Sequence, residues 1–437
     1  MSRSGSPSAV RALGDRPASR TLEKGAVLSL SLLLTSTYSV STVIPSMVSY
    51  YQGYGRGQIE QLISVTSVAI MVVILLNPWI SRIISQRVSI VSGLLLLSAG
   101  GCLPVFTKAY GAVFAGRLVL GVGIGLVNVY AVDMINSRFE GEERSTLLGY
   151  RGSAEIVGNT ALTLVVGQIL GAGLDWRYCF LIYLSGLLVL VSYLLFVPKA
   201  PGKNGNSAGD ALTGKSVNPA GGVLTGKSVN SAGDALPGKS GPAEAERAQK
   251  ASDWRRHAWG FLSCALHGAM FIGINTCTTM RIPSLVLERG MGTEAQSSLI
   301  TSLMLAAGIG AGILFGRLAR ILRGMMQKFW LVVFGCGMGV MALAGNLWIL
   351  GIGAVVTGFA FSILIVTVFE QIPGRFPPGV TTMATTWTLV GCNMGSGFSS
   401  WALRLIDLAG GGMGTSFGVF AVLMVFLGLV KRPGKAR

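Results

Sequence analysis

Long apolar runs are the feature that most constrains what this chain can fold into, because twelve of them follow one another and most contain no charged residue. A helix needs roughly 20 such residues to cross the hydrocarbon core of a bilayer. Only helices and closed barrels satisfy their backbone polar groups there, and the alternating strands of a barrel are absent from the sequence. The sequence therefore predicts an all-α membrane protein. The twelve predicted spans are 25–47, 60–81, 88–107, 111–134, 152–174, 177–197, 258–280, 296–317, 328–346, 347–369, 379–402 and 412–430.

The charged residues predict the orientation of these helices. Only 12% of the 437 residues are charged, whereas soluble proteins carry about a quarter. The formal net charge of +17 would suit nucleic-acid binding, but most of the 35 lysine and arginine residues fall on one side of the membrane when the N-terminus is cytoplasmic. This is the positive-inside pattern. We therefore expect a multi-pass protein of the cytoplasmic membrane, with both termini in the cytoplasm and no nucleic-acid partner.

Two further features restrict the class of protein. The first 24 residues lack the apolar stretch of a cleavable signal peptide, so the first helix is expected to act as its own insertion signal. The six cysteines all fall in predicted helices and form no CxxC pair. They are expected to pack as small residues, and the sequence predicts no disulfide framework, no metal site and no cofactor.

A segment at 199–257 separates the first six predicted helices from the last six. It contains GDALTGKS (209–216), GGVLTGKS (221–228) and GDALPGKS (233–240), which all fit the phosphate-loop pattern G-x-x-x-x-G-K-[ST]. A working phosphate loop needs a strand before its glycines and a helix after its Lys-Ser. Here each copy belongs to a repeated unit rich in Gly, Ser and Asn, which is typical of a low-complexity linker. We expect a linker, and a membrane-anchored P-loop NTPase is the distant alternative.

Related segments lie on either side of this linker. FEGEER (139–144) follows the fourth predicted helix and FEQIPGR (369–375) follows the tenth, while NPWISRIISQR (77–87) and GRLARILRG (316–324) follow the second and the eighth. Two parallel repeats of six helices are the layout of one large class of transporters. The predicted organisation is a cytoplasmic tail at 1–24, a six-helix bundle at 25–198, a cytoplasmic linker at 199–257, a second six-helix bundle at 258–431 and a cytoplasmic tail at 432–437.

On these motifs the chain resembles the major facilitator superfamily over nearly all of residues 25–431. RLVLGVGIG (117–125) keeps the family motif R-x-x-x-G, and the loop after the second helix keeps Arg82 of the motif G-x-x-x-D-R-x-G-R-R. EERSTLLGY (142–150) and DWRYCFLIY (175–183) are also typical of the family. The resemblance is strongest to bacterial twelve-helix carriers of the drug-exporter-like type. It implies a major facilitator fold, with two pseudo-symmetric bundles of six helices.

The resemblance implies a secondary active transporter that moves a small organic solute by alternating access and is not an enzyme. Export of drug-like or other amphipathic compounds is the preferred hypothesis. The alternative is a carrier of small organic anions, by uniport, symport or exchange, that uses Arg117; a channel is a further alternative. The expected partners are the solute and the lipid bilayer, a proton or another ion is left open as the coupling ion, and a monomer is expected.

Candidate residues for solute binding or coupling are polar groups inside predicted helices. A cation at Arg117 should face the bundle interior, although it would also be explained by snorkelling or by bonds to helix carbonyls. A lone histidine in an apolar helix is more often a packing residue than a proton relay. Hydroxyl groups often bond their own helix, so a packing role is open for them as well. The candidates are Arg117, Tyr38, His267, Asn275, Thr276 and Trp387.

A second set of candidates lies near the predicted cytoplasmic ends of helices. The resemblance implies that Asp133 and Arg82 form a charge pair that stabilises the outward-open state. Arg151 and Glu155 are four residues apart on one helix, and we expect them to join this gating network. Glu370 is expected to do the same in the second half. The alternative is ordinary surface ion pairing, which is typically worth under about 1 kcal/mol.

Glycine pairs at a spacing of four residues predict close helix crossings. Gly121 and Gly125 lie in the fourth predicted helix, and Gly312 and Gly316 lie in the eighth. Small residues let the backbones of membrane helices approach closely. We therefore expect both pairs to lie at helix contacts.

Overall fold

Helices make up all the regular structure in the part of the chain that the computed structural model describes, residues 17–139, 141–197, 242–410 and 412–430. The repeats at 209–216, 221–228 and 233–240 lie outside these described residues, as do most of the predicted tails. The first half contains α1 (Pro17–Ser29), η1 (Leu30–Leu33), η2 (Ser36–Tyr38), η3 (Ser41–Val43), α2 (Ile44–Tyr50), α3 (Arg56–Ile83), α4 (Gln86–Phe106), α5 (Tyr110–Arg138), α6 (Gly141–Gly171), η4 (Trp176–Leu184) and α7 (Ser185–Phe196). The second half contains α9 (Pro242–Glu288), α10 (Glu294–Leu322), η5 (Arg323–Met325), α11 (Met326–Ala342), α12 (Leu347–Arg375), α13 (Pro378–Gly397), α14 (Ser399–Leu408) and α15 (Met413–Val430).

Helical structure lies at each of the twelve predicted spans. Nine helices of the described residues are long and apolar enough to cross a membrane, and α1 to α2 forms a tenth span if its 42° bend is counted within one helix. The shorter apolar helix α11 covers the ninth predicted span, and α13 with α14 covers the eleventh. The main difference from the prediction is length: α9 begins at Pro242, so the last part of the predicted linker is helical.

The first membrane helix is broken where the sequence reads TSTYSVST (35–42). Three short 3₁₀ segments replace the α-helix between Ser29 and Ile44. Here the Ser36 hydroxyl donates to the Leu33 carbonyl at 2.7 Å, and the Ser41 hydroxyl donates to the Tyr38 carbonyl at 2.7 Å. Hydroxyl side chains that bond nearby carbonyls compete with regular helix bonding, which explains the break.

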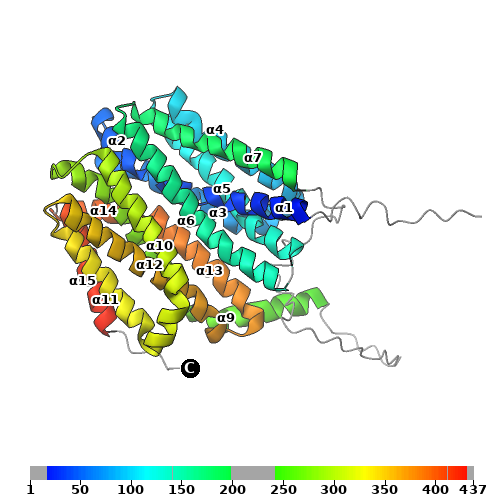
Figure 1. The fold of residues 1–437 in the computed structure, drawn as a ribbon. Helices are drawn as coiled ribbons and strands as arrows, with labels where there is room; N and C mark the ends of the chain where they lie inside the picture. The colour runs from blue at the N-terminus through cyan, green and yellow to red at the C-terminus, as the bar shows by residue number, and fades with distance from the viewer. Residues whose placement is uncertain (1–16, 140, 198–241, 411, 431–437) are drawn as a thin grey trace, which may run out of the picture.

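The two halves form two bundles that pack side by side (Figure 1). In the first bundle α5 packs against both α3 and α4, and in the second α9 packs against α13 and α11 packs against α12 and α15. The bundles meet along α6 with α10 and along α3 with α13 and α14. We call the end where α2 passes into α3 and α9 into α10 the loop end, and the opposite end, where α1 begins and α12 ends, the terminal end.

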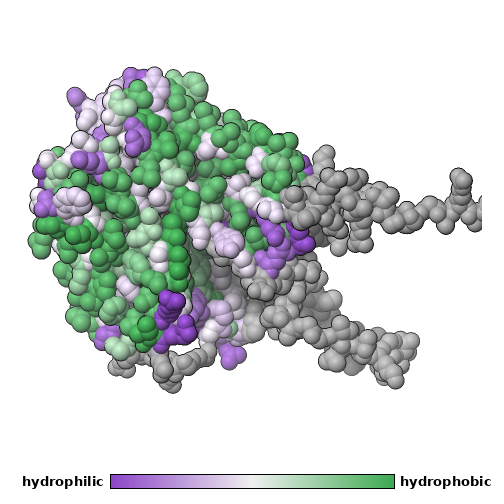
Figure 2. Space-filling model, in the orientation of Figure 1, coloured by the Kyte–Doolittle hydropathy of each residue, from purple (hydrophilic) through white to green (hydrophobic). Residues whose placement is uncertain are grey.

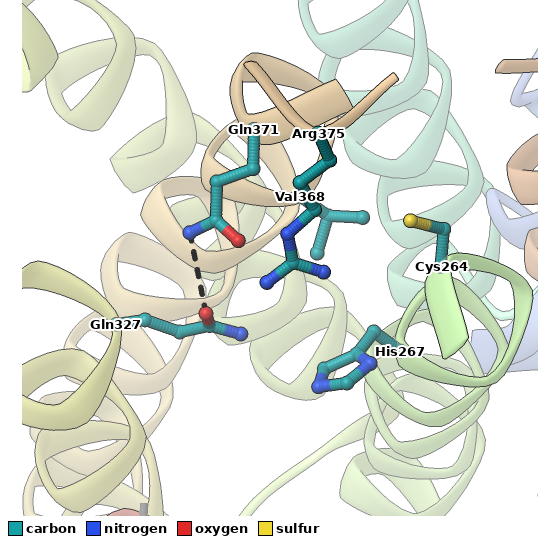
Figure 3. Close-up of a pocket in the computed structure, with 6 residues that line it drawn as sticks. All are labelled: Cys264, His267, Gln327, Val368, Gln371 and Arg375. Carbon is teal, nitrogen blue, oxygen red and sulfur yellow. Dashed lines mark hydrogen bonds between the residues drawn. The ribbon is translucent and has the colours of Figure 1, made fainter. Parts of the chain in front are cut away.

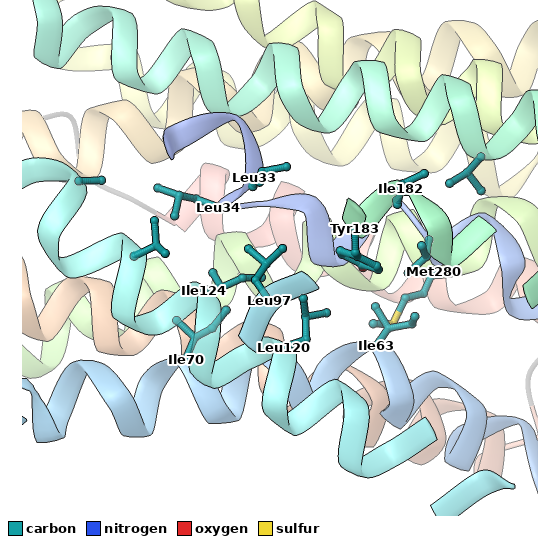
Figure 4. Close-up of a cluster of buried hydrophobic side chains, with 14 of the residues drawn as sticks. Leu33, Leu34, Ile63, Ile70, Leu97, Leu120, Ile124, Ile182, Tyr183 and Met280 are labelled. Carbon is teal, nitrogen blue, oxygen red and sulfur yellow. The ribbon is translucent and has the colours of Figure 1, made fainter. Parts of the chain in front are cut away.

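Buried aliphatic side chains form the core of the first bundle. Leu97 of α4, Leu120 and Ile124 of α5 and Ile63 of α3 have almost no exposed surface (Figure 4). Met280 of α9 belongs to the same cluster, so the core continues from the first bundle into the second. Between helices in a bilayer, close van der Waals packing of such side chains stabilises the contacts.

The glycine prediction was correct for one pair and wrong for the other. A Cβ atom at Gly121 would lie 2.5 Å from the Thr66 carbonyl oxygen of α3, and one at Gly125 would lie 2.7 Å from Val73 Cβ. These two glycines therefore allow α5 to approach α3 closely. At Gly312 and Gly316 an added Cβ would meet nothing within 4 Å, so this pair lies at no close crossing.

The outer flank of the molecule is apolar. Figure 2 shows hydrophobic side chains over most of this face and hydrophilic ones gathered toward the two ends. Leu188, Trp348 and Val422 are among the large apolar side chains that are more than two-thirds exposed, at 74%, 84% and 71%. In water such a surface would be unfavourable, whereas lipid chains cover it in a membrane.

Candidate functional site

A buried ionic cluster joins the two bundles at the loop end. Glu60 of α3 and Arg281 of α9 are both 0% exposed, and Arg281 Nε lies 3.3 Å from Glu60 Oε1. Arg281 also donates from its Nη2 to Asp407 Oδ2 of α14 at 2.6 Å. One guanidinium of the second bundle therefore holds a carboxylate of each bundle.

Burial makes this cluster sensitive to separation. Neither Glu60 oxygen has a hydrogen bond from another described residue, so Arg281 supplies its countercharge by proximity alone. Removing one partner of a buried ion pair typically costs about 3–5 kcal/mol, because an uncompensated charge is left behind. If the bundles separate here, water takes over the solvation of the charges. The cluster is therefore suited to a contact that opens into water.

Further charges surround the cluster and also bridge the bundles. Arg56 of α3 lies 3.9 Å from Glu288 of α9 and donates to Met413 Sδ at 2.8 Å. Arg281 donates to the same sulfur at 2.8 Å. The loop end thus brings two guanidinium groups and three carboxylates together between the bundles.

Hydroxyl contacts extend this closure toward the middle of the molecule. Ser64 of α3 pairs with Ser400 of α14 at 2.8 Å. Deeper, the Tyr38 hydroxyl lies 2.6 Å from Ser396 of α13, which also pairs with Ser67 at 2.8 Å. The structure therefore places Tyr38, a predicted solute contact, at the junction of the two bundles. Near the surface Ser46 donates to Glu294.

Ionic contacts at the terminal end lie within one bundle. Among the described residues, Glu143 of α6 pairs with Lys24 at 2.6 Å and with Arg20 at 2.7 Å, and Glu23 pairs with Arg138. The Lys24 ammonium that donates to Glu143, together with the Arg20 guanidinium, holds the pKa of Glu143 below its usual range. These pairs fix α1 to α5 and α6 and do not hold the bundles together.

A polar group lies in the first bundle, toward the terminal end of its membrane-spanning segments. Arg151 and Glu155 of α6 form an ion pair at 2.7 Å, and Arg151 also donates to Asn128 of α5 at 3.1 Å. The Thr35 hydroxyl, at the break in the first membrane helix, donates to the Glu155 carbonyl at 3.1 Å. The Arg151 and Glu155 side chains are 20% and 22% exposed, so polar atoms can reach them. The predicted pair therefore forms, at the level of the helix-one break.

Arg117 is enclosed within the first bundle. It is 0% exposed, its Nε donates to the Leu62 carbonyl at 2.9 Å, and its Nη1 donates to the Tyr183 hydroxyl at 2.8 Å. The guanidinium also lies over the Phe180 ring, 5.4 Å from its centroid. These contacts connect α5 with α3 and η4, and Arg117 does not lie beside the other candidate residues.

His267 of α9 lies in a small pocket of the second bundle (Figure 3). Its Nδ1 lies 2.7 Å from the Ser263 carbonyl, and since a carbonyl only accepts, Nδ1 carries the proton. Trp387 packs near Phe261 in a cluster at the same end of the bundle. Thr276 is 2% exposed, and Asn275 Oδ1 is buried with no hydrogen bond from a described residue.

The predicted gating residues do not all come together. Arg82 and Glu370 are exposed at the terminal end, on α3 and α12. The Asp133 side chain lies outside the described residues, so its predicted pairing with Arg82 stays a prediction. Arg151 and Glu155 form their own pair, away from Arg82.

Sequence reasoning missed the cluster of Glu60, Arg281 and Asp407. One predicted span begins at residue 60 and another ends at residue 280, so Glu60 and Arg281 fall at predicted helix boundaries. In the structure α3 begins at Arg56 and α9 continues to Glu288, which brings both residues inside long helices. The available signal was opposite charge at the same end of three helices, with apolar residues on both sides.

Two helical bundles that close against one another at one end are the architecture of a carrier that alternates access between the sides of a membrane. Residues 26–428 match the model of the Major Facilitator Superfamily, and the chain belongs to this family. It is therefore a multi-pass membrane protein of a family of non-enzymatic secondary transporters, as predicted. The drug-exporter-like subtype stays a prediction.

Solved structures with the same fold include transporters of different solutes. A D-xylose–proton symporter is 16% identical, with 95% of this chain and 98% of that chain covered and a TM-score of 0.68. The xylose transporter XylE from E. coli, in an inward-open conformation, is 15% identical, with 96% and 98% covered and a TM-score of 0.66. A peptide transporter POT in complex with alafosfalin is 14% identical, with 94% and 93% covered and a TM-score of 0.67. These similarities show the fold alone.

One relative found by sequence matches a smaller part of this chain. The MFS-type transporter ppz2 of Metarhizium majus is 30% identical over 138 residues, which are 30% of this chain and 23% of that protein. The match thus spans under a quarter of the relative's length.

Proposed function

We propose that the chain carries a small organic solute across the cytoplasmic membrane by alternating access, with Glu60, Arg281 and Asp407 as its outer gate. The positive-inside pattern assigns the loop end to the outside. The buried contact of Arg281 with Glu60, which joins the bundles there, carries the proposal. In this assignment the described conformation is closed toward the outside.

The solute is proposed to bind at the polar group of Thr35, Asn128, Arg151 and Glu155. These residues remain partly accessible, and Asn128, Arg151 and Glu155 lie toward the terminal end of their membrane-spanning segments. Ile156 borders α10 across the bundle contact, since an added Cβ at Gly308 would lie 3.5 Å from its Cδ1. An ion pair beside an amide and a hydroxyl suits a solute with hydrogen-bonding groups of both kinds on an apolar frame.

The position of Arg117 favours export of amphipathic compounds over carriage of an organic anion. Its guanidinium is engaged by Leu62, Tyr183 and Phe180 inside the first bundle. In this proposal Arg117 positions α3 and η4 against α5 and does not contact the solute. An organic-anion carrier would instead need Arg117 to turn toward the solute pathway.

Glu60 is the proposed coupling group for protons. Opening of the gate exposes its carboxylate to outside water, and closure returns it to a buried position beside Arg281. Asp407 and Arg56 are the further charged groups around it, through Arg281 and along α3. A carboxylate that alternates between water and burial is able to take up and release a proton at different stages of the cycle.

The experiment is ethidium flux in proteoliposomes with and without a pH gradient. Wild-type protein should move ethidium faster with the gradient. Glu60→Gln should retain downhill flux but lose the acceleration, whereas Asp175→Asn, a substitution at the loop end outside the gate, should behave as wild type. Acceleration that persists in Glu60→Gln would reject Glu60 as the coupling group, and absence of saturable flux with any amphipathic cation tested would reject the exporter assignment.

A further inference from the structure

A small pocket in the terminal half of the second bundle lies apart from the gate and from the proposed solute group. It is enclosed by α9, α11 and α12, and its volume is about 10 Å³. The side chains of three helices converge on it (Figure 3). Its lining residues are Cys264, His267, Gln327, Val368, Gln371 and Arg375.

The charge in this pocket is unbalanced. The Arg375 guanidinium extends between Gln327 and His267 in the close-up of Figure 3. The lining contains no carboxylate, and within the described residues no hydrogen bond or ion pair joins Arg375 to a protein acceptor. A cation at the end of α12 is favoured by the helix dipole, but the dipole does not explain why the guanidinium turns into a pocket lined with amides.

The hydrogen-bond pattern leaves the amide hydrogens of Gln327 facing the same space. Gln371 donates from Nε2 to Gln327 Oε1 at 3.3 Å, so the oxygen of Gln327 is engaged and its amide hydrogens are turned to other acceptors. His267 is held in place by its Nδ1–H bond to the Ser263 carbonyl. Gln327 is only 8% exposed, so its amide is largely removed from water.

We propose that this pocket binds one chloride ion, held by the Arg375 guanidinium and the Gln327 amide. A volume of about 10 Å³ admits roughly one water-sized particle. Phosphate, sulfate and the carboxylate of an organic solute have several heavy atoms, so this small volume favours a monatomic anion. Because Arg375 is itself exposed on one side, the ion exchanges with the solution at the terminal end. The ion neutralises Arg375 and ties α11 and α12 together.

The test is thermal unfolding of the full-length purified protein in sodium chloride and in sodium gluconate at equal ionic strength. Chloride should raise the Tm of the wild type by about 2 °C, as expected for a weak ligand that binds only the folded state. Arg375→Gln should lose this increment. Arg320→Gln, which removes an exposed arginine of α10 that bonds only its own helix among the described residues, should keep it. Equal chloride increments in all three proteins would overturn the proposal.

Chlorine-35 line broadening provides a measurement that does not depend on stability. Wild-type protein should broaden the chloride signal, and Arg375→Gln, confirmed as folded by gel filtration, should reduce the excess broadening at least threefold. Added bromide should compete with chloride for the site and reduce the excess broadening. Competition by sulfate as strong as that by bromide would show a larger polyanion site and would contradict the chloride assignment.

Discussion

Arg281 of the second bundle and Glu60 of the first lie 3.3 Å apart, and neither side chain has any exposed surface. Their contact is the most deeply buried charge pair among the described residues, and it lies on the boundary between two bundles that are also joined by the more exposed Arg56–Glu288 pair and by apolar and hydroxyl contacts. Its free energy therefore depends on whether the bundles touch at the loop end. This makes the pair a direct determinant of which conformation is populated.

Removal of the shared guanidinium should open the loop end. Arg281→Gln leaves Glu60 and Asp407 without their common partner, and loss of one member of a buried pair costs about 3–5 kcal/mol. The closed state bears this cost, because water solvates the carboxylates in the open state. The labelling rate of Ser64→Cys by a membrane-impermeant maleimide should rise at least tenfold, in a background where the exposed Cys336 is replaced by serine.

The matched control for this labelling is Arg404→Gln. Arg404 is an exposed cation of α14 at the same end, and its side chain packs near Gly57 and forms no ion pair with another described residue. The Arg404→Gln substitution should leave the labelling rate of Ser64→Cys within twofold of the rate measured without it. Equal acceleration by both substitutions would mean that total charge, and not the buried pair, keeps the loop end closed.

Truncation of Arg117 should affect stability more than solute recognition. Arg117→Ala removes a fully buried side chain and leaves the Tyr183 hydroxyl and the Leu62 carbonyl without their donor. We expect the free energy of unfolding to fall by about 2–4 kcal/mol. Nano differential scanning fluorimetry would show this loss as a lower Tm. Unchanged Tm together with selective loss of organic-anion flux would instead favour a solute contact at Arg117.

Two glycines provide a matched test of helix packing. Gly121→Ala places a Cβ 2.5 Å from the Thr66 backbone oxygen, so α5 has to move away from α3 and stability should fall by about 1–3 kcal/mol. Gly312→Ala meets nothing within 4 Å and should be neutral or stabilise by up to about 1 kcal/mol through helix propensity. Thermal unfolding of the two variants beside the wild type checks the prediction, and a Gly312→Ala loss equal to that of Gly121→Ala would contradict it.

The ion pairs of Glu143 should contribute to stability in a pH-dependent way. Lys24 and Arg20 hold the pKa of this carboxyl below its usual range. Its contribution is therefore complete above the unfolded pKa of about 4.3 and is lost as the pH falls through the lower folded value. The Tm difference between wild type and Glu143→Gln should be constant from pH 7 to pH 5 and should shrink toward pH 3. A Tm difference between the two proteins that grows as the pH falls would contradict the lowered pKa of Glu143.

The membrane helices could be predicted from the sequence because apolar length is a local property. The close crossing at Gly121 and Gly125 was also predicted correctly, since small residues at this spacing suit a helix contact. The same spacing at Gly312 and Gly316 gave a wrong prediction, because a spacing does not say which face of α10 meets a neighbour. Contacts between elements distant in sequence decide that.

The gate could not be predicted for a related physical reason. Glu60, Arg281 and Asp407 are each unremarkable near the end of a predicted span, and only the packing of α3, α9 and α14 brings them together, with Glu60 and Arg281 fully buried. Arg117 shows the opposite limitation. Its position inside a helix predicted a costly buried cation correctly, but the sequence did not reveal that Tyr183 and Leu62 supply its partners.

The central claim is that the Glu60–Arg281 contact keeps the loop end closed while the terminal end is free to open. Electron–electron double resonance tests it with spin labels at Tyr54→Cys and Leu343→Cys on the loop end, and separately at Ile83→Cys and Ile321→Cys on the terminal end, all exposed positions of opposite bundles. In Arg281→Gln the loop-end distance should lengthen and the terminal-end distance should shorten. An unchanged loop-end distance, or lengthening at both ends, would contradict the account.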